Sequence, residues 1–434
     1  MNMKNIALFG IIFALLIIVG FMQSWVVAFG ILNLCLLSSI MALGVNIQWG
    51  YAGLFSVGTM GFVALGGVAA VVTSMPPVNE AWSAGMLGIL ASMAIAIATI
   101  LIAIRIWRKM PSGRNRSLTM AATLIIGFVV YRYVFDPAVA SIERIDPAGT
   151  GYLGGLGLPI LVSWGVGGLF AAGAAWVIGK IALGLRSDYL AIATLGIAEI
   201  VIAVIKNEDW LTRGVKNVNG IERPWPVPLE VDLQASETFV AWADWIGVGA
   251  VTGSAIWVKL LYAGLFIIVL AIIMWMSEKA LNSPWGRMMR AIRDNEEAAE
   301  AMGKDVTARH LQVFVLGSAV CGIAGAMLVT MDGLLTPGTY QPLRFTFLIW
   351  VMVIVGGSGN NWGSVLGGFL IWFLWIEVEP IGLWLINQLT SGMSEGNALR
   401  EHLLDSAAHM RLLTMGLILL LVLRFSPRGL IPEK

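Results

Sequence analysis

Charged residues are scarce in this chain of 434 residues: Asp, Glu, Lys and Arg make up only 12%, whereas hydrophobic residues make up 58%. Soluble domains carry roughly a quarter charged residues, so the composition excludes an ordinary soluble protein. The net charge is only +1, which argues against a nucleic-acid partner because such a partner needs a basic surface. The two cysteines, Cys35 and Cys321, lie in apolar runs, so no disulfide framework is expected. The composition predicts a polytopic membrane protein.

Catalytic and nucleotide-binding motifs are also missing. Gly356, Gly357 and Gly359 form a glycine-rich stretch, but no Lys-Ser/Thr pair follows, so it is predicted to be a tight cytoplasmic turn and not a phosphate loop. His402 and His409 are seven residues apart, which fits a solvated helix face better than a metal site. No catalytic residue, no cofactor and no metal ion are therefore expected, and the chain is not expected to be an enzyme.

Apolar runs of about 20 residues, the length needed to cross a bilayer, are abundant. The first run is not followed by a small-residue cleavage site, so it is expected to remain as a span. The sequence predicts an all-α bundle of about ten to twelve transmembrane helices in a single domain over 1–434. The first pair and 344–358 are also open to a re-entrant or broken arrangement. The predicted spans lie near 5–22, 25–47, 52–73, 84–106, 118–135, 160–180, 188–206, 258–277, 310–331, 344–358, 363–385 and 410–424.

The basic residues predict the orientation, because cytoplasmic loops are enriched in Lys and Arg. Residues 105–116 carry five basic residues and no acid, and Arg424 and Arg428 lie near the C-terminus. Residues 207–257 are instead rich in acids and are expected to form a long periplasmic loop. An even number of spans then places both termini in the cytoplasm.

Residues 278–310 form a polar segment between two apolar spans, with as many bases as acids, so this segment cannot lie in lipid. Ser283 and Pro284 are suited to a helix N-cap and first turn. Residues 294–302 are rich in Glu and Ala and predict a short helix, and Gly303 suits its C-terminal cap. An ordinary solvated loop is the alternative interpretation.

The spacing Glu297-Ala298-Ala299-x-x-x-Gly303 resembles the EAA loop of bacterial ABC importer permeases. In that family a short helix docks into a cleft of a cytoplasmic ATPase and acts as a lever. The resemblance makes 278–310 a cytoplasmic coupling segment, with Arg290 and Arg293 beside the motif. The usual hydrophobic–x–Leu–Pro ending is missing.

Three further stretches resemble the permeases of branched-chain amino acid ABC transporters. The first is Gly50-Tyr51-Ala52-Gly53-Leu54-Phe55-Ser56-Val57-Gly58. The second begins at Leu185-Arg186-Ser187-Asp188-Tyr189, and the third is Val355-Gly356-Gly357-Ser358-Gly359. With the coupling segment they cover most of residues 44–380 in the family's order. Leu54 in place of the common Gln, and the altered stretch Thr212–Ile221, leave the exact solute open.

This resemblance implies a multi-pass permease subunit in the bacterial inner membrane that moves branched-chain amino acids. It also implies a second, homologous permease, two cytoplasmic ATPases, a periplasmic binding protein and surrounding membrane lipid as partners. ATP would be hydrolysed by the partners. A urea or short-chain amide permease is the alternative, because those permeases have similar motifs. A self-sufficient secondary transporter is a further alternative, but such proteins usually carry charged groups at the midplane and related halves.

The expected translocation path or helix-packing surface involves Gly50, Tyr51, Gly53, Ser56, Gly58 and Glu199. The glycines from Gly50 to Gly67 are expected to line one stretch of helix, where close helix packing is the favoured role. Glu199 is predicted to be the only acid well inside a span. An intramembrane carboxylate is expensive, so this residue is expected either to meet a solute ammonium or to form a packing hydrogen bond.

Overall fold

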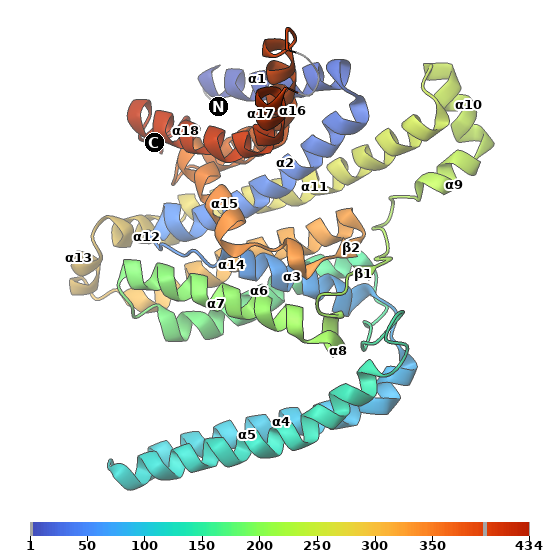
Figure 1. Ribbon diagram of the computed structural model, residues 1–434. Coiled ribbons are helices and arrows are strands. Elements are labelled where there is room, and N and C mark those ends of the chain that lie inside the picture. The colour runs from blue at the N-terminus through green and yellow to red at the C-terminus, as the bar shows by residue number, and fades with distance from the viewer. Residues whose placement is uncertain (1–2, 394–396, 434) are drawn as a thin grey trace.

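The computed structural model describes residues 3–393 and 397–433 and is almost entirely helical (Figure 1). Within this part of the chain, ten helical segments are long and apolar enough to cross a membrane. They are α1 (Met3–Met22), α2 (Trp25–Val45), α4 (Asn79–Lys109), α5 (Arg114–Glu143), α6 (Ile160–Ala182), α7 (Ser187–Asn207), α11 (Ala250–Asn282), α14 (Val306–Asp332), α16 (Asn361–Leu389), and α17 (Ala398–Asp405) with η3 (Ser406–His409) and α18 (Met410–Phe425).

Shorter elements connect these helices. They are η1 (Asn46–Gly50), α3 (Thr59–Ser74), α8 (Asp209–Thr212), α9 (Glu230–Ala235), α10 (Glu237–Ile246), α12 (Pro284–Asp294), α13 (Glu296–Ala301), η2 (Pro337–Thr339) and α15 (Pro342–Gly356). The strands β1 (Val218–Asn219) and β2 (Leu334–Leu335) pair antiparallel, with Val218 opposite Leu335. The predicted all-α fold is confirmed. Two of the predicted spans, those that correspond to α3 and α15, are apolar helices too short to be counted among the ten membrane-spanning segments.

Polar side chains set the starts of several helices, as expected where backbone N–H groups would otherwise lack partners. Ser24 caps α2 by accepting a hydrogen bond from Val27 N, and Asp305 caps α14 in the same way. Asn360 caps α16 and follows a turn at Gly357 and Gly359, both of which have positive φ. This confirms a tight turn in the glycine-rich stretch.

The centre of the bundle is α14, which packs against α2, α3 and α6. Small residues allow this: a Cβ added to Gly325 would overlap the Val63 carbonyl, and one added to Gly66 would overlap the Gly322 carbonyl. Helices in lipid associate largely through such close backbone approach. The packing role predicted for Gly66 therefore follows from its position against α14.

The helix predicted over 52–73 is shorter than expected, because it begins only at Thr59. Before it, α2 passes into the π-helix η1, and the chain from Gly53 to Gly58 is not helical. The prediction that the glycines from Gly50 to Gly67 line one helix is wrong for this reason. We refer to residues 46–58 as the break.

Backbone groups in the break find partners on other helices, which makes non-helical chain tolerable inside a bundle of apolar helices. Val57 N donates to Thr194 Oγ1 of α7 at 3.0 Å, and the Trp350 indole of α15 donates to Ser56 O at 3.1 Å. The Trp350 ring also lies against the rings of Trp49 and Phe55. The break is therefore tied to both α7 and α15.

Helices α4 and α5 form a hairpin that stands apart from the bundle (Figure 1). The two helices pack along each other and meet the rest of the molecule near α8. At that end Phe135 packs edge-on against Trp210, and the Trp82 indole donates to Leu153 O. Elsewhere the hairpin turns large apolar side chains such as Ile100 and Ile125 outward.

The coupling segment and residues 207–257 lie at opposite ends of the bundle (Figure 1). Both described chain ends lie near the coupling segment, because Asn5 and Glu433 line one pocket together with Arg290 and Asn360. The side of the membrane on which the two termini lie stays a prediction.

Candidate coupling and transport site

The coupling segment contains two helices and not the single one predicted over 294–302. Helix α12 ends at Asp294, and α13 begins at Glu296. Asn295 separates them because its extended backbone interrupts the helix and its side chain accepts a hydrogen bond from Ala298 N. Ser283 caps α12, with Pro284 in the first turn, as expected. Gly303 follows α13 with a φ of +76°, which suits a C-terminal cap.

The EAA-like residues present an exposed surface. Glu297 and Ala298 are exposed, whereas Ala299 is buried against the rest of the chain. No heavy atom lies within 4 Å of a Cβ added to Gly303. The α13 turn therefore offers small side chains and the exposed carboxylates of Glu296, Glu297 and Glu300 to solvent, a surface that another protein could cover.

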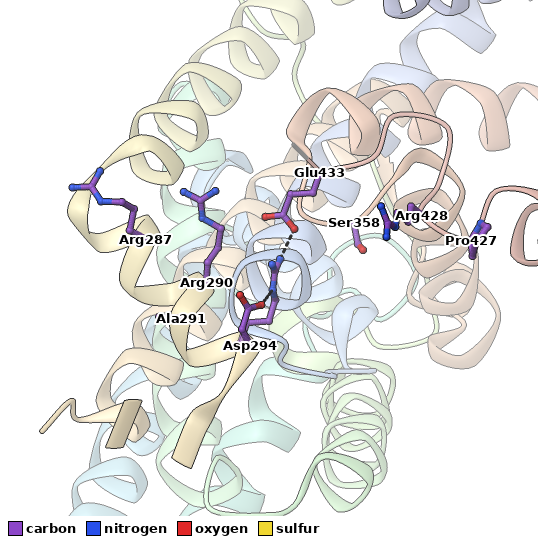
Figure 2. A pocket seen from close by; sticks show the side chains of 9 residues that line it. Arg287, Arg290, Ala291, Asp294, Ser358, Pro427, Arg428 and Glu433 are labelled. Carbon is purple, nitrogen blue, oxygen red and sulfur yellow. Dashed lines mark hydrogen bonds and ion pairs between the residues drawn. The ribbon is translucent and has the colours of Figure 1, made fainter. Parts of the chain in front are cut away.

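An open pocket of about 750 Å³ lies between α12, the turn before α16 and the C-terminal tail. Figure 2 shows Arg287 and Arg290 on one side of this pocket, Ser358, Arg428 and Pro427 on the other, and Glu433 between them. The pocket carries more basic than acidic side chains, so it favours an acidic partner.

Arg293 lies between this pocket and the break. Its Nη1 donates to Gly50 O and lies 2.8 Å from Glu433 Oε2, and its Nε lies 3.2 Å from Asp294 Oδ1. Burial alone would lower the pKa of this guanidinium, but the hydrogen bonds and charges of Glu433 and Asp294 raise that pKa above its ordinary value. Arg293 therefore stays charged.

Tyr51 belongs to a buried polar cluster at the same end of the bundle. Its hydroxyl donates to Asn361 Oδ1, which also accepts from Asn46 Nδ2 at 3.1 Å. Asn361 Nδ2 donates to Glu278 Oε1 at 3.0 Å. The cluster joins the break to the end of α11 and the start of α16, and it satisfies polar groups that would be costly to bury alone.

Gly50 and Gly58 are needed for close approach. A Cβ on Gly50 would overlap the Asn46 side chain and the backbone of Gly359, and one on Gly58 would lie 2.8 Å from Thr194 O. Ser56 is fully buried between these positions. The structure thus brings Gly50, Tyr51 and Arg293 together, whereas Gly58 and Ser56 lie against α7 and α15.

Glu199 lies on the exposed face of α7, beside Ile200, and not in the packed interior of this chain. Its predicted status as the only acid well inside a span is wrong. Glu377 lies in the middle of α16, is 2% exposed, and accepts a hydrogen bond from Gln23 at 2.7 Å. Gln23, which lies just after α1, therefore supplies a partner for one of the two buried carboxylate oxygens.

Sequence reasoning missed Asn46, Asn361 and Glu433. A signal existed for the first, since Asn46 lies near the end of an apolar run. A polar side chain in that position must find a partner. Glu433 carries no sequence signal, because its role depends on where the C-terminal tail lies.

Comparison with known families decides the class of protein. Residues 138–423, well over half of the chain, match the model of the branched-chain amino acid transport system permease component. The chain belongs to this family. It is a membrane subunit of a transporter and not an enzyme, and with its ten apolar helices it is a multi-pass protein of the bacterial inner membrane.

Among individual relatives, the chain is similar to the high-affinity branched-chain amino acid transport system permease protein LivM of Escherichia coli, with 28% identity over 48% of each chain. It is also similar to a probable LivM of Methanocaldococcus jannaschii, with 27% identity over 61% of this chain and 65% of the relative. The fructose import permease protein FrcC of Rhizobium meliloti is 22% identical over 59% of each chain.

These matches are partial, because the chain spans about half the length of the first curated relatives it matches. The family match begins in α5, so α1 to α4 lie outside it. No solved structure matches the chain.

Proposed function

We propose that the chain is one of two permease subunits of an ATP-driven importer for branched-chain amino acids. Two cytoplasmic ATPases and a periplasmic binding protein complete this transporter. Support comes from the family and from relatives named as branched-chain amino acid permeases. The observation that carries most weight is the exposed α13 turn with Glu297 at one end of the bundle, opposite residues 207–257.

In this proposal α12 and α13 dock on the ATPase, and the end of the bundle that carries them faces the cytoplasm together with both termini. The exposed Glu297 and Ala298 enter a cleft of the ATPase, and Arg290 with its neighbours in the pocket meets acidic side chains there. Glu and Ala in a short capped helix make a stiff lever.

The path for the solute runs along the open face of α7, against the second permease. The reason is physical: Ile200 is 63% exposed, and the neighbouring Glu199 places a carboxyl group on the exposed face of a span. A carboxylate facing lipid is costly, whereas one facing a wet interface between two permeases can attract the ammonium of an amino acid. Gly58 and Ser56 of the break lie directly behind this helix.

The first experiment is to purify the chain from its native membrane and identify what accompanies it by mass spectrometry. We expect a second permease and ATPase subunits. The complex is then placed in liposomes with ATP inside and the binding protein outside, and uptake of leucine, urea and fructose is compared. ATP-dependent leucine uptake supports the proposal. Preferential urea uptake would assign the alternative solute, and uptake by the lone chain without ATP would overturn the importer function.

A further inference from the structure

The Arg293 side chain connects three parts of the chain that are far apart in sequence. It projects from the last turn of α12, donates to the Gly50 carbonyl of the break, and pairs with Glu433 of the C-terminal tail. Its side chain is only 24% exposed and that of Glu433 27% exposed. Arg293 is therefore an internal connection and not a surface charge.

Glycines make room for this side chain. A Cβ added to Gly53 would lie 3.3 Å from Arg293 Cγ, and one added to Gly359 would lie 3.1 Å from Arg293 Nη1. Both glycines have left-handed backbone conformations, with φ of +70° and +78°. We call the space bounded by Gly50, Gly53 and Gly359 the arginine slot. It explains why two of the family-like stretches carry glycine at these points.

The counter-ion of Arg293 is anchored to the bundle and not to α12. The tail that carries Glu433 is held by backbone hydrogen bonds from Leu430 N to Val355 O and from Ile431 N to Gly356 O, both 2.9 Å long. Asn360 Nδ2 also donates to Pro432 O. Glu433 can therefore hold the guanidinium in one orientation while α12 moves.

The other end of the connection is the break itself. Gly50 ends η1, and the non-helical chain that follows is bonded to Thr194 of α7 and to Trp350 of α15. A displacement of the Gly50 carbonyl therefore acts directly on the chain segment between α12 and α7. A guanidinium suits this task, because its planar fork bonds two acceptors in a fixed geometry, which an ammonium cannot do.

We propose that Arg293 is a positioning residue that transmits the movement of α12 to the break, with Glu433 fixing its orientation in the arginine slot. The inference rests on the proposed ATP-driven function, in which the ATPase moves α12. The alternative role is a static ion pair that only stabilises the fold. Loss of a transmitting residue should lower uptake per ATP hydrolysed, whereas loss of a static ion pair should leave that ratio unchanged.

The test uses the complete transporter in liposomes and measures ATP hydrolysis and uptake separately for Arg293→Gln and Arg293→Lys. We expect hydrolysis to persist while uptake per ATP falls about tenfold, the size expected from losing one hydrogen bond to a charged group. Arg424→Gln is the control for loss of a charge, because Arg424 is exposed at the end of α18. Normal uptake per ATP in Arg293→Gln would overturn the proposal.

A second readout follows the movement itself. A cysteine is placed at Phe55, which is 38% exposed in the break, whereas the native Cys35 and Cys321 are buried. We expect ATP to change the rate of thiol labelling at this position in the otherwise wild-type complex and to have no effect when Arg293→Gln is added. An equal change in both would overturn transmission through Arg293.

The slot is tested by a matched pair of glycines. Gly53→Ala places a methyl group against Arg293, whereas Gly247→Ala introduces the same backbone strain, at a φ of +77°, with no heavy atom within 4 Å. We expect Gly53→Ala to lower uptake per ATP and Gly247→Ala to leave it unchanged. Equal losses in both would exclude the slot.

Two outcomes separate this inference from the function on which it rests. If the wild-type complex shows no ATP-driven uptake, both are overturned. If the wild-type complex is active and Arg293→Gln fails to assemble, Glu433→Gln decides, because it leaves Arg293 and its bond to Gly50 in place. Reduced uptake per ATP with intact assembly then supports transmission, and unchanged uptake per ATP refutes it.

Discussion

The bundle around α14 and the α4–α5 hairpin are both strongly apolar, yet they meet their surroundings in different ways. In the bundle, backbone packs on backbone: Gly325 lies against the Val63 carbonyl and Gly66 against Gly322. In the hairpin, long side chains such as Ile100 and Ile125 point outward. Hydropathy alone therefore identifies a helix that can cross a membrane, but small residues indicate which helices are enclosed by others.

The bundle also encloses polar side chains. The bundle buries Asn46, Asn361 and Glu377, and each has a side-chain hydrogen-bond partner from another part of the chain. The hairpin has its own small core, formed around Ala81, Ile89 and Ile142. We infer that the hairpin is an addition to the bundle, because it has a core of its own and meets the rest of the molecule near α8.

The largest effect is expected from filling a backbone contact in the bundle. Gly325→Leu should destabilise the protein by an amount near the upper end of the about 1–3 kcal/mol typical of overpacked cores. Thermal unfolding in detergent, followed by size-exclusion chromatography, measures the loss. Gly173→Leu is the control, since no heavy atom lies within 4 Å of its added Cβ. Equal stability of the two variants would contradict the packing described for α14.

The second largest effect is expected at the turn after α13, where a substitution should lower transport without changing the packing of the bundle. Gly303→Arg places a bulky charge on the exposed turn after α13 and should reduce uptake per ATP about tenfold, within the range of coupling free energies. Gly303→Asn is the control, because Asn tolerates a left-handed backbone. Uptake and hydrolysis are measured in liposomes. Normal transport by Gly303→Arg would refute the docking role of α13.

A smaller effect is expected on the open face of α7. Glu199→Gln should lower uptake about fivefold, roughly the contribution of one hydrogen bond, while the complex still assembles. The matched change in the hairpin is Glu80→Gln, at an exposed acid in the first turn of α4. If uptake is the same in both variants, the path does not run along α7.

The smallest effect should follow removal of the hairpin. Val78 N donates to Leu153 O at 3.1 Å, so these residues can be joined by a short Gly-Ser linker after deletion of residues 79–152. Because two helices are lost, the orientation of the rest is kept. The melting temperature should change by less than about 4 °C, equivalent to ~1 kcal/mol. A collapse of the bundle would show that the hairpin is part of its core.

Several features of the fold could be predicted from local sequence. Ser283 with Pro284 identified the start of α12, and Gly303 identified the end of α13, because caps act over a few residues. The start of α3 could not be predicted in this way. The stretch before Thr59 contains Gly53 and Gly58, but only the structure shows that Gly53 has a φ of +70° and that the non-helical backbone is bonded to Thr194 and Trp350.

The candidate site also contains residues that local sequence identified and partners that only the structure revealed. Arg293 was recognised as a member of the coupling segment, but its partner Glu433 lies at the other end of the chain, and no local pattern links the two. Glu199 was expected to be the only acid inside a span, although the predicted span 363–385 itself contains Glu377. Hydropathy treats both acids alike, and only packing separates the buried one from the exposed one.

Composition and apolar run length thus determined by themselves that this chain is an all-α membrane protein, because the bilayer demands long helices whose backbone groups bond within the helix. The motifs around Gly50, Glu297 and Gly356 determined its family by resemblance. Tertiary structure alone decided where the α2–α3 helix breaks, which acids are enclosed, and that Arg293 joins α12 to the break. Those outcomes depend on contacts between residues far apart in the sequence, and the free energy of such contacts cannot be read from a local sequence pattern.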